Sequence, residues 1–360
     1  LQQGLNGMNR ILINGNFLCR NLTGIERFAW EVLARMDKCI KDEDISIYIP
    51  ANAKVFPEYK NIHIVISEKQ IRSFPLWDLF YFKGACKKLK AIGLNFSNTA
   101  PLGKYCGFAF LHDIYAKDFP KDFAGFKDKL IKIYCRLNYR NIAKNAKKVL
   151  TVSEFSAARI KKAYKVPDEK IKIIPNGWEH FKDIIPDGTV FEKFPSLKKG
   201  SYYFTLGSLS KRKNLRWIAE YAKEHPEEHF AVSGKAISGL VPPELKDLQT
   251  LKNVTLLGYV SDEQVKCLMQ NAAAFIFPSY YEGFGIPPLE ALCCGTPVVI
   301  SKSASLPGIY GTAAHYIDAD STNCSISDLL KEPVSSPDEV LETYTYENAA
   351  KKLLDILQSC

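Results

Sequence analysis

The sequence predicts an α/β protein made of two Rossmann-like, doubly wound domains. Apolar runs of strand length alternate with longer helical patterns along most of the 360 residues. The alternation breaks in a stretch at 178–200 that is rich in Pro, Lys and Asp, and then resumes. Strands separated by helices form right-handed βαβ units in a parallel sheet, and a chain of this length suffices for about two domains. Ligands are then expected at the carboxyl ends of the strands.

The expected elements follow this alternation through both halves of the chain. In the first half, strands are expected at 10–14, 45–49, 62–66, 94–96, 107–111, 148–152 and 171–174, with helices after Gly24 and at 126–145 and 153–164. In the second half, strands are expected at 202–206, 230–233, 254–257, 273–278 and 297–301, with helices near 215–224 and at 346–357. The predicted domains are 8–180 and 201–343, with a linker at 181–200 and the closing helix within 344–360. Because Met8 precedes an apolar strand, residues 1–7 are expected to be an expression scar.

Composition excludes several classes of protein. With 46% hydrophobic and 24% charged residues, the chain is not mainly disordered, collagen-like or coiled-coil. It has no run of about 18 apolar residues, so no transmembrane helix is expected. The ten cysteines include no CxxC pair and are expected to be reduced, in a cytosolic protein. The six histidines show no metal-ligand spacing, so no metal is expected.

Charge is distributed unevenly along the chain. Residues 1–200 hold 35 Lys and Arg against 20 Asp and Glu, whereas residues 201–360 hold 13 against 19. Charge runs are usually solvated helix faces, but here the whole first half is basic, which indicates an anionic partner. Aromatic residues interleave the basic stretch, and no nucleic-acid-binding motif occurs. A peripheral membrane face is therefore favoured over a nucleic-acid site.

The most informative segment is 277–292, FPSYYEGFGIPPLEAL, which lies between two expected strands. Gly283 and Gly285 let backbone N–H groups approach an anion, and the helix expected near Pro287 points its positive end the same way. Glu282 and Glu290 bracket this turn and could accept hydrogen bonds from hydroxyls. A nucleotide sugar offers such a combination of diphosphate and hydroxyls. Alternatively, Glu290 is only a carboxylate favoured by the helix dipole.

A second segment places cations at the end of a strand. Gly207 ends the strand expected at 202–206, and Lys211, Arg212 and Lys213 follow it before the next helix. Cations at this position suit a diphosphate leaving group, whose charge grows as the glycosidic bond breaks. The alternative is a loop of solvated lysines.

The first half contributes weaker candidates. Gly24 opens a helix after the first strand but lacks the GxGxxG spacing of a dinucleotide site. His112 and Asp113 stand at the end of a strand that faces the expected cleft, although a lone histidine is more often structural than catalytic. Ser153 is expected to cap the helix that begins after it.

Together these segments resemble the retaining GT-B glycosyltransferases of family GT4, and the likeness spans nearly the whole chain. Glu282 and Glu290, with seven residues between them, look like the EX7E motif of that family. Five further segments occur in the order seen in bacterial polysaccharide mannosyl-, rhamnosyl- and glucosyltransferases: 23–27, 111–113, 151–156, 174–177 and 212–214. The resemblance implies a GT-B fold, with an acceptor-binding first domain, a nucleotide-sugar-binding second domain and a closing helix that crosses back to the first.

The resemblance also implies roles for single residues, without a metal. Glu282 would contact the donor sugar near the reacting carbon, and His112 would lie beside the anomeric centre and the acceptor. Glu290 would hold the ribose and Lys213 the diphosphate. The other donor-binding residues would be Gly24, Gly207, Ser208, Arg212, Gly283, Phe284, Gly285 and Ile286. Retention would proceed by front-face attack, with the leaving diphosphate helping to remove the acceptor proton.

Two positions depart from the family pattern. Ser208 stands where many members carry Arg, for which Arg212 is the candidate substitute, and Gly308 stands where relatives often carry Glu. Neither departure removes Glu282, Glu290 or Lys213, so activity is expected.

The predicted function is therefore transfer of a hexose or deoxyhexose from a GDP-, UDP- or dTDP-linked sugar to a glycan acceptor. The acceptor is expected to be lipid-linked, in bacterial surface polysaccharide synthesis. The enzyme is expected in the cytoplasm, peripheral on the anionic inner face of the plasma membrane, with no cofactor and no nucleic-acid partner. The alternatives are a nucleotide-sugar epimerase or a glucan synthase on the same fold, or a catalytically silent nucleotide-sugar-binding subunit. The intact Glu282, Lys213 and Glu290 argue against the silent subunit.

Overall fold

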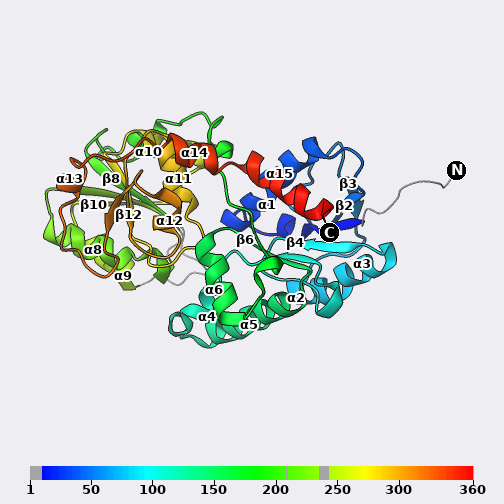
Figure 1. Ribbon diagram of the computed structural model, residues 1–360. Coiled ribbons are helices and arrows are strands. Elements are labelled where there is room, and N and C mark those ends of the chain that lie inside the picture. Colours follow the sequence, from blue (N-terminus) through cyan, green and yellow to red (C-terminus); the bar gives the residue numbers. More distant parts are fainter. Residues whose placement is uncertain (1–9, 208–209, 235–242, 360) are drawn as a thin grey trace. The chain divides into compact units, whose positions relative to one another are not determined.

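The computed structural model describes residues 10–207, 210–234 and 243–359, with side chains left out at 243–246 (Figure 1). The chain forms two compact units. Unit 1 comprises Leu1–Asn176 and Tyr346–Cys360, and unit 2 comprises Gly177–Thr345. The expected expression scar at 1–7 lies outside the described residues.

Unit 1 is built on a seven-stranded parallel sheet in the order β3-β2-β1-β4-β5-β6-β7. The strands are β1 (Ile11–Asn14), β2 (Ile45–Ile49), β3 (His63–Ile66), β4 (Ile92–Asn95), β5 (Phe108–Phe110), β6 (Lys148–Thr151) and β7 (Ile171–Ile173). Six of them run through the segments predicted as strands nearly to the residue, and β4 begins two residues before its predicted start. The strand order reverses beside β1, which is the arrangement of a doubly wound fold.

Helices cover both faces of the unit 1 sheet because successive strand residues point to opposite faces. Ile11 and Ile13 pack with α1 (Gly24–Cys39) and α15 (Tyr346–Gln358), whereas Leu12 packs with Trp77 on the other face. Figure 1 shows α1 and α15 together on one side of the sheet. The other α-helices of unit 1 are α2 (Phe74–Leu76), α3 (Lys83–Leu89), α4 (Tyr115–Asp118), α5 (Phe126–Asn145) and α6 (Glu154–Tyr164). A π-helix, η2 (Trp77–Phe82), joins α2 to α3, and the short 3-10 helices are η1 (Gly15–Cys19), η3 (Gly103–Tyr105), η4 (Pro120–Asp122) and η5 (Asp168–Lys170).

Unit 2 is built on a six-stranded parallel sheet in the order β10-β9-β8-β11-β12-β13. The strands are β8 (Tyr202–Leu206), β9 (His229–Ser233), β10 (Val254–Gly258), β11 (Ala274–Phe277), β12 (Val298–Ser301) and β13 (His315–Ile317). The helices are α7 (Thr189–Lys193), α8 (Leu215–Glu224), α9 (Pro243–Thr250), α10 (Asp262–Gln270), α11 (Ile286–Cys293), α12 (Leu306–Tyr310), α13 (Ile326–Leu329) and α14 (Asp338–Thr343), with turns η6 (Glu179–Phe181) and η7 (Lys211–Lys213). The sequence did not predict β13, a three-residue strand at the edge of the sheet.

The segment expected to be a linker, 181–200, lies inside unit 2. The buried Lys266 of α10 donates hydrogen bonds from Nζ to the carbonyl oxygens of Phe181, Lys182 and Ile184, at 2.9, 2.7 and 2.8 Å. An ammonium group has three donors and can thus tie three carbonyls of an irregular segment to one helix. The weak periodicity of this stretch therefore reflects short packed turns.

The closing helix α15 belongs to unit 1 although 169 residues of unit 2 precede it. Its first residue, Tyr346, is fully buried, and its ring lies 6.3 Å from that of Phe28 on α1. Among the described residues, no helix is long and apolar enough to cross a membrane.

Candidate active site

The candidate site of unit 2 lies where the strand order of its sheet reverses. β8 and β11 are neighbours there, and β9 lies on the other side of β8. Loops that leave such a switch point diverge to opposite faces of the sheet and open a crevice at the carboxyl ends of the strands. A small hollow occurs at this point, lined by Thr205, Leu206, Gly207, Lys213, Leu215, Ser233 and Phe277.

Local geometry brings Lys213 back over the end of β8. A Cβ at Gly207 would lie 3.2 Å from both Cδ and Cε of Lys213, so the missing side chain leaves room for the lysine stem. Asn214 adopts a left-handed conformation (φ 58°), and its amide donates to the carbonyl oxygens of Pro278 (3.1 Å) and Ala319 (2.8 Å). The cationic turn is therefore fastened to the segment after β11. Ser208, predicted to bind the donor, lies outside the described residues.

Lys213 and Glu282 form a buried ion pair. Nζ of Lys213 lies 2.7 Å from Oε1 of Glu282, and 13% and 7% of the two side chains are exposed. Arg212 adds a second cation, with Nη1 at 4.0 Å from Oε2 of the same carboxylate. Lys213 Nζ also lies 4.5 Å from the centre of the Phe277 ring. The two predicted motifs, 69 residues apart in the chain, thus meet at one carboxylate.

The charge of this carboxylate follows from its neighbours. Burial raises the pKa of Glu282, but Lys213 and then Arg212 outweigh burial, so the pKa lies below its ordinary value. Glu282 is therefore ionised at neutral pH. An anionic ligand that binds Lys213 would have to share the lysine with this carboxylate.

The loop that carries Glu282 is held by hydrogen bonds to its backbone. The hydroxyl of Ser305 donates to the carbonyl oxygens of Glu282 and Phe284, both at 3.0 Å, and the hydroxyl of Tyr310 donates to that of Gly285. These hydrogen bonds hold the loop through three of its carbonyl groups, and α11 starts directly after Gly285. Gly283, Phe284, Gly285 and Ile286, predicted to bind the donor, are therefore the last loop residues and the first residue of the helix.

Gly285 is expected to be intolerant of any side chain. Its φ is +98°, and a Cβ there would lie 2.6 Å from Cδ2 of Leu306. We expect Gly285→Ala to lower the free energy of unfolding by about 2 kcal/mol or more, through backbone strain and the clash. Gly308→Ala is the matched control: a Cβ at Gly308, within α12, meets nothing within 4 Å. Urea unfolding of both variants checks this, and equal stabilities would contradict it.

Glu290 lies on α11 and is held by a residue that the sequence did not indicate. Nε2 of His180, in η6, lies 2.9 Å from Oε1 of Glu290, and 2% and 11% of these side chains are exposed. The two residues are 110 positions apart. His180 falls in the stretch of weak periodicity, three residues after the segment 174–177. No pattern in the sequence pairs it with Glu290, so only the folded structure identifies it as the partner of that carboxylate.

Unit 1 contributes His112 and Gly24, which are described here by themselves. His112 follows β5 and is buried, with its ring stacked on Phe110 at 5.3 Å. Its Nε2 lies 2.8 Å from the carbonyl oxygen of Phe96, so the ring donates a proton from Nε2. Burial lowers the pKa of His112 to about 4. Gly24 is exposed and begins α1. The position of both relative to Glu282 stays a prediction.

Two family profiles match the chain in succession. Residues 22–180 match Glycosyltransferase Family 4, and residues 188–351 match Glycosyl transferases group 1. The chain is a family 4 glycosyltransferase.

Curated relatives of this glycosyltransferase include enzymes of O-antigen synthesis. It is 28% identical to the O-antigen chain mannosyltransferase RfbU of Salmonella typhimurium over 358 residues, which covers 94% of this chain and 96% of the relative. It is 32% identical to the O-antigen chain mannosyltransferase B of Escherichia coli over 199 residues, or 52% of this chain and 51% of the relative. These matches support a hexosyltransferase.

Solved structures place the glycosyltransferase in the GT-B fold. Sucrose-phosphate synthase from Thermosynechococcus elongatus is 14% identical with a TM-score of 0.73, and 98% of each chain is covered. Anabaena Alr3699/HepE, in complex with UDP and glucose, is 16% identical with a TM-score of 0.68, covering 98% of this chain and all of that one. The predicted fold class is therefore confirmed.

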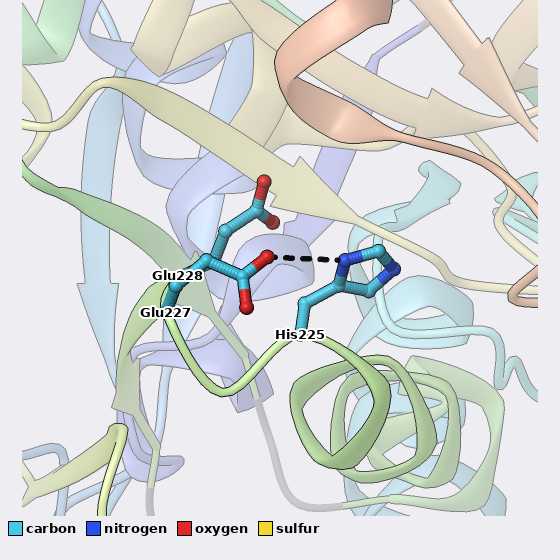
Figure 2. A group of neighbouring side chains, drawn as sticks. All are labelled: His225, Glu227 and Glu228. Atoms are coloured by element: carbon cyan, nitrogen blue, oxygen red, sulfur yellow. Dashed lines mark ion pairs between the residues drawn. The ribbon is translucent and has the colours of Figure 1, made fainter.

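A second group of polar side chains in the glycosyltransferase lies away from the candidate site. His225, Glu227 and Glu228 follow α8 and precede β9, with possible ligand atoms within 4.8 Å of one another (Figure 2). Nδ1 of His225 lies 3.5 Å from Oε1 of Glu227, whose side chain is 68% exposed. This group lies at the start of β9, whereas the site lies at the ends of the strands. Exposed acidic groups of this kind are common without a metal ion, and we assign none to this group.

The low pKa of His112 predicts that its ring in this glycosyltransferase remains uncharged at mildly acidic pH. A ring that titrates at about 4 stays neutral from pH 8 to pH 5, whereas an ordinary histidine gains a proton near pH 6.5. We expect the Cε1–H resonance of His112, assigned with His112→Asn, to keep its chemical shift over this range. A shift with a midpoint near 6.5 would contradict the buried, neutral ring.

Proposed function

We propose that this glycosyltransferase moves a hexose or deoxyhexose from a nucleoside diphosphate sugar to a lipid-linked glycan, with retention at the anomeric carbon. The observation that carries the proposal is the buried pair of Lys213 and Glu282 at the switch point of unit 2. Few ligands need a cation and a carboxylate side by side. A sugar diphosphate does, because its phosphates bind the cation and its hydroxyls bind the carboxylate.

The donor would lie along the loop and the start of α11. Lys213 and Arg212 would bind the diphosphate, helped by backbone N–H groups of the loop before α11 and of Ile286, because Pro287 and Pro288 have none to offer. Glu282 would accept hydrogen bonds from sugar hydroxyls, and Glu290, oriented by His180, would accept them from the ribose. His112, as a neutral ring, would serve as a hydrogen-bonding group beside the sugar.

The proposed reaction exchanges one bond at the anomeric carbon. The bond from this carbon to the diphosphate oxygen breaks, and a bond to the acceptor hydroxyl oxygen forms on the same face. The acceptor proton passes to the departing diphosphate. Lys213 and Arg212 would stabilise the charge that develops on the diphosphate, which is where fixed cations lower a barrier most. We propose that the chain's own cations supply this role and that no metal is required.

Relatives support the acceptor class. Besides the two O-antigen mannosyltransferases, an Escherichia coli UDP-Gal:alpha-D-GlcNAc-diphosphoundecaprenol alpha-1,3-galactosyltransferase is 33% identical over 154 residues, 40% of this chain and 39% of that relative. We propose by analogy that the acceptor belongs to bacterial surface polysaccharide synthesis. The enzyme would then work at the cytoplasmic face of the plasma membrane, whose anionic lipids suit the basic first half of the chain.

A thermal-shift screen tests the donor. Wild type and Glu290→Ala would be heated with GDP-, UDP-, ADP- and dTDP-sugars without added metal. A ligand at 100 times its Kd stabilises the folded state by about 2.7 kcal/mol, which raises Tm by a few degrees. We expect a shift with one nucleotide class that is lost in Glu290→Ala.

Product analysis tests the reaction itself. With the identified donor and a lipid-diphosphate oligosaccharide acceptor, NMR of the product should show the anomeric configuration of the donor retained. An inverted product would refute front-face transfer. Donor binding without any transfer to acceptor or water would favour the silent binding subunit.

A further inference from the structure

Helix α5 exposes an apolar stripe to solvent. Phe126, Leu130, Ile133 and Leu137 have exposed fractions of 79%, 54%, 54% and 60%. Their spacing of four, three and four residues places them within roughly 60° around the helix. A solvent-facing stripe of four large apolar side chains is unusual, because a surface helix normally presents polar residues there.

The opposite side of the same helix does the packing. Tyr139, Ile142 and Ala143 are buried with Ala109 and Val149 of the unit 1 sheet. Since α5 already buries one apolar face, the stripe contributes nothing to the described core of unit 1. Its large side chains therefore indicate a partner outside the unit.

Cations border the stripe. α5 carries six Lys and Arg residues and a single acidic residue, Asp128. Lys129, Arg136 and Arg140 are exposed, and at 100° per residue they fall beside one edge of the stripe. Long basic side chains at the border of an apolar surface keep their charges in water while their stems cover apolar area.

Two further elements on the same face of the unit 1 sheet also expose apolar side chains. α2 and η2 expose Leu76, Phe80 and Tyr81, at 50%, 65% and 40%. Like α5, η2 packs on the sheet face away from α1 and α15, as the core clusters of Leu12 and of Ala109 show. Figure 1 shows α2, α3 and α5 together on that side of unit 1.

We propose that the stripe on α5 inserts into the surface of a bilayer that contains anionic lipids. A second copy of the chain would bring two basic faces together, which repel. A nucleic acid would pair with the cations but leave the apolar side chains without a partner. Anionic headgroups above acyl chains match both features, as in helices that lie in the membrane interface. This inference adds a surface to the proposed function and agrees with a lipid-linked acceptor, but its test needs no activity.

Vesicle flotation of the full chain tests the proposal. We expect wild type to bind phosphatidylcholine vesicles that contain phosphatidylglycerol, and to bind pure phosphatidylcholine vesicles much less. Leu130→Gln with Leu137→Gln keeps good helix formers and removes half of the stripe, and should weaken binding by about tenfold or more. The matched control, Ile66→Gln with Ile185→Gln, removes two exposed apolar side chains from elsewhere (59% and 81% exposed) and should bind as wild type does.

A charge variant and a solution measurement complete the test. Lys129→Gln with Arg136→Gln should reduce binding to anionic vesicles, and high salt should reduce it in wild type. Circular dichroism verifies that each variant folds. Equal binding by wild type and the stripe variant would overturn the proposal. So would a wild-type dimer in analytical ultracentrifugation that the stripe variant abolishes. Nucleotide binding measured without vesicles does not involve the stripe, so failure here and failure of the proposed reaction remain distinguishable.

Discussion

Glu282→Gln is expected to lower kcat by about 100-fold or more while free nucleoside diphosphate binds as well as before or more tightly. The carboxylate lies at 2.7 Å from Lys213 and is ionised, so glutamine removes a charge near the proposed sugar site while keeping its shape. Fixed groups that act on developing charge contribute rate factors of this size. Binding improves because the diphosphate no longer shares Lys213 with Glu282.

This opposite effect on binding and catalysis is what separates a catalytic role from a structural one. Calorimetry with the nucleoside diphosphate and steady-state transfer assays measure the two quantities. Glu220→Gln is the matched control, because Glu220 also pairs with a cation, Arg216 at 2.7 Å, but is exposed on α8. We expect Glu220→Gln to change neither quantity. A kcat for Glu282→Gln within a few-fold of wild type would remove Glu282 from the chemistry.

The sequence predicted the fold well because its signals are local. Strand-length apolar runs between helices determine a parallel sheet through the handedness of βαβ units, so both sheets could be expected without tertiary information. The segment at 181–200 was harder because it is short and irregular. It packs against α10 through Lys266, whose ammonium group donates to carbonyl oxygens about 80 residues earlier in the chain. No local sequence pattern predicts such a contact.

The candidate site was predictable for a related reason. In a parallel sheet, loops after neighbouring strands meet at one edge, so Lys213 after β8 and Glu282 after β11 had to come close once the strand order was given. The contact of His180 with Glu290 could not be inferred in this way, because His180 is not at the end of a strand of the unit 2 sheet. It lies in η6, between β7 of unit 1 and β8 of unit 2. Strand ends can be inferred from alternation, whereas packed turns depend on the finished tertiary structure.

Lys213→Met is expected to abolish donor binding and also to destabilise unit 2. Methionine keeps an unbranched chain against Phe277, so the change removes mainly the charge. Removal of one partner from a buried pair leaves the other charge uncompensated and typically costs about 3–5 kcal/mol. We expect about 3 kcal/mol, since Arg212 remains at 4.0 Å from Glu282. Urea unfolding measures this loss.

The pH dependence of that loss identifies its cause. In wild type the pKa of Glu282 is lowered, so the pair stabilises the fold above the unfolded pKa of about 4.3 and ceases to do so as the pH falls through the folded value. Without Lys213, burial should raise this pKa, and the unpaired charge should destabilise the fold at neutral pH but not once protonated. The difference between wild type and Lys213→Met should therefore be largest near pH 7 and shrink below pH 5.

The double variant Lys213→Met with Glu282→Gln tests whether the unpaired carboxylate causes the loss of stability. It removes both charges, so it should recover much of the stability that Lys213→Met loses, at neutral pH, while donor binding and transfer remain absent. A double variant as unstable as Lys213→Met would mean that lost packing rather than an unpaired carboxylate destabilises the fold. If the double variant recovers stability but not activity, the ion pair is needed for ligand binding and not for folding.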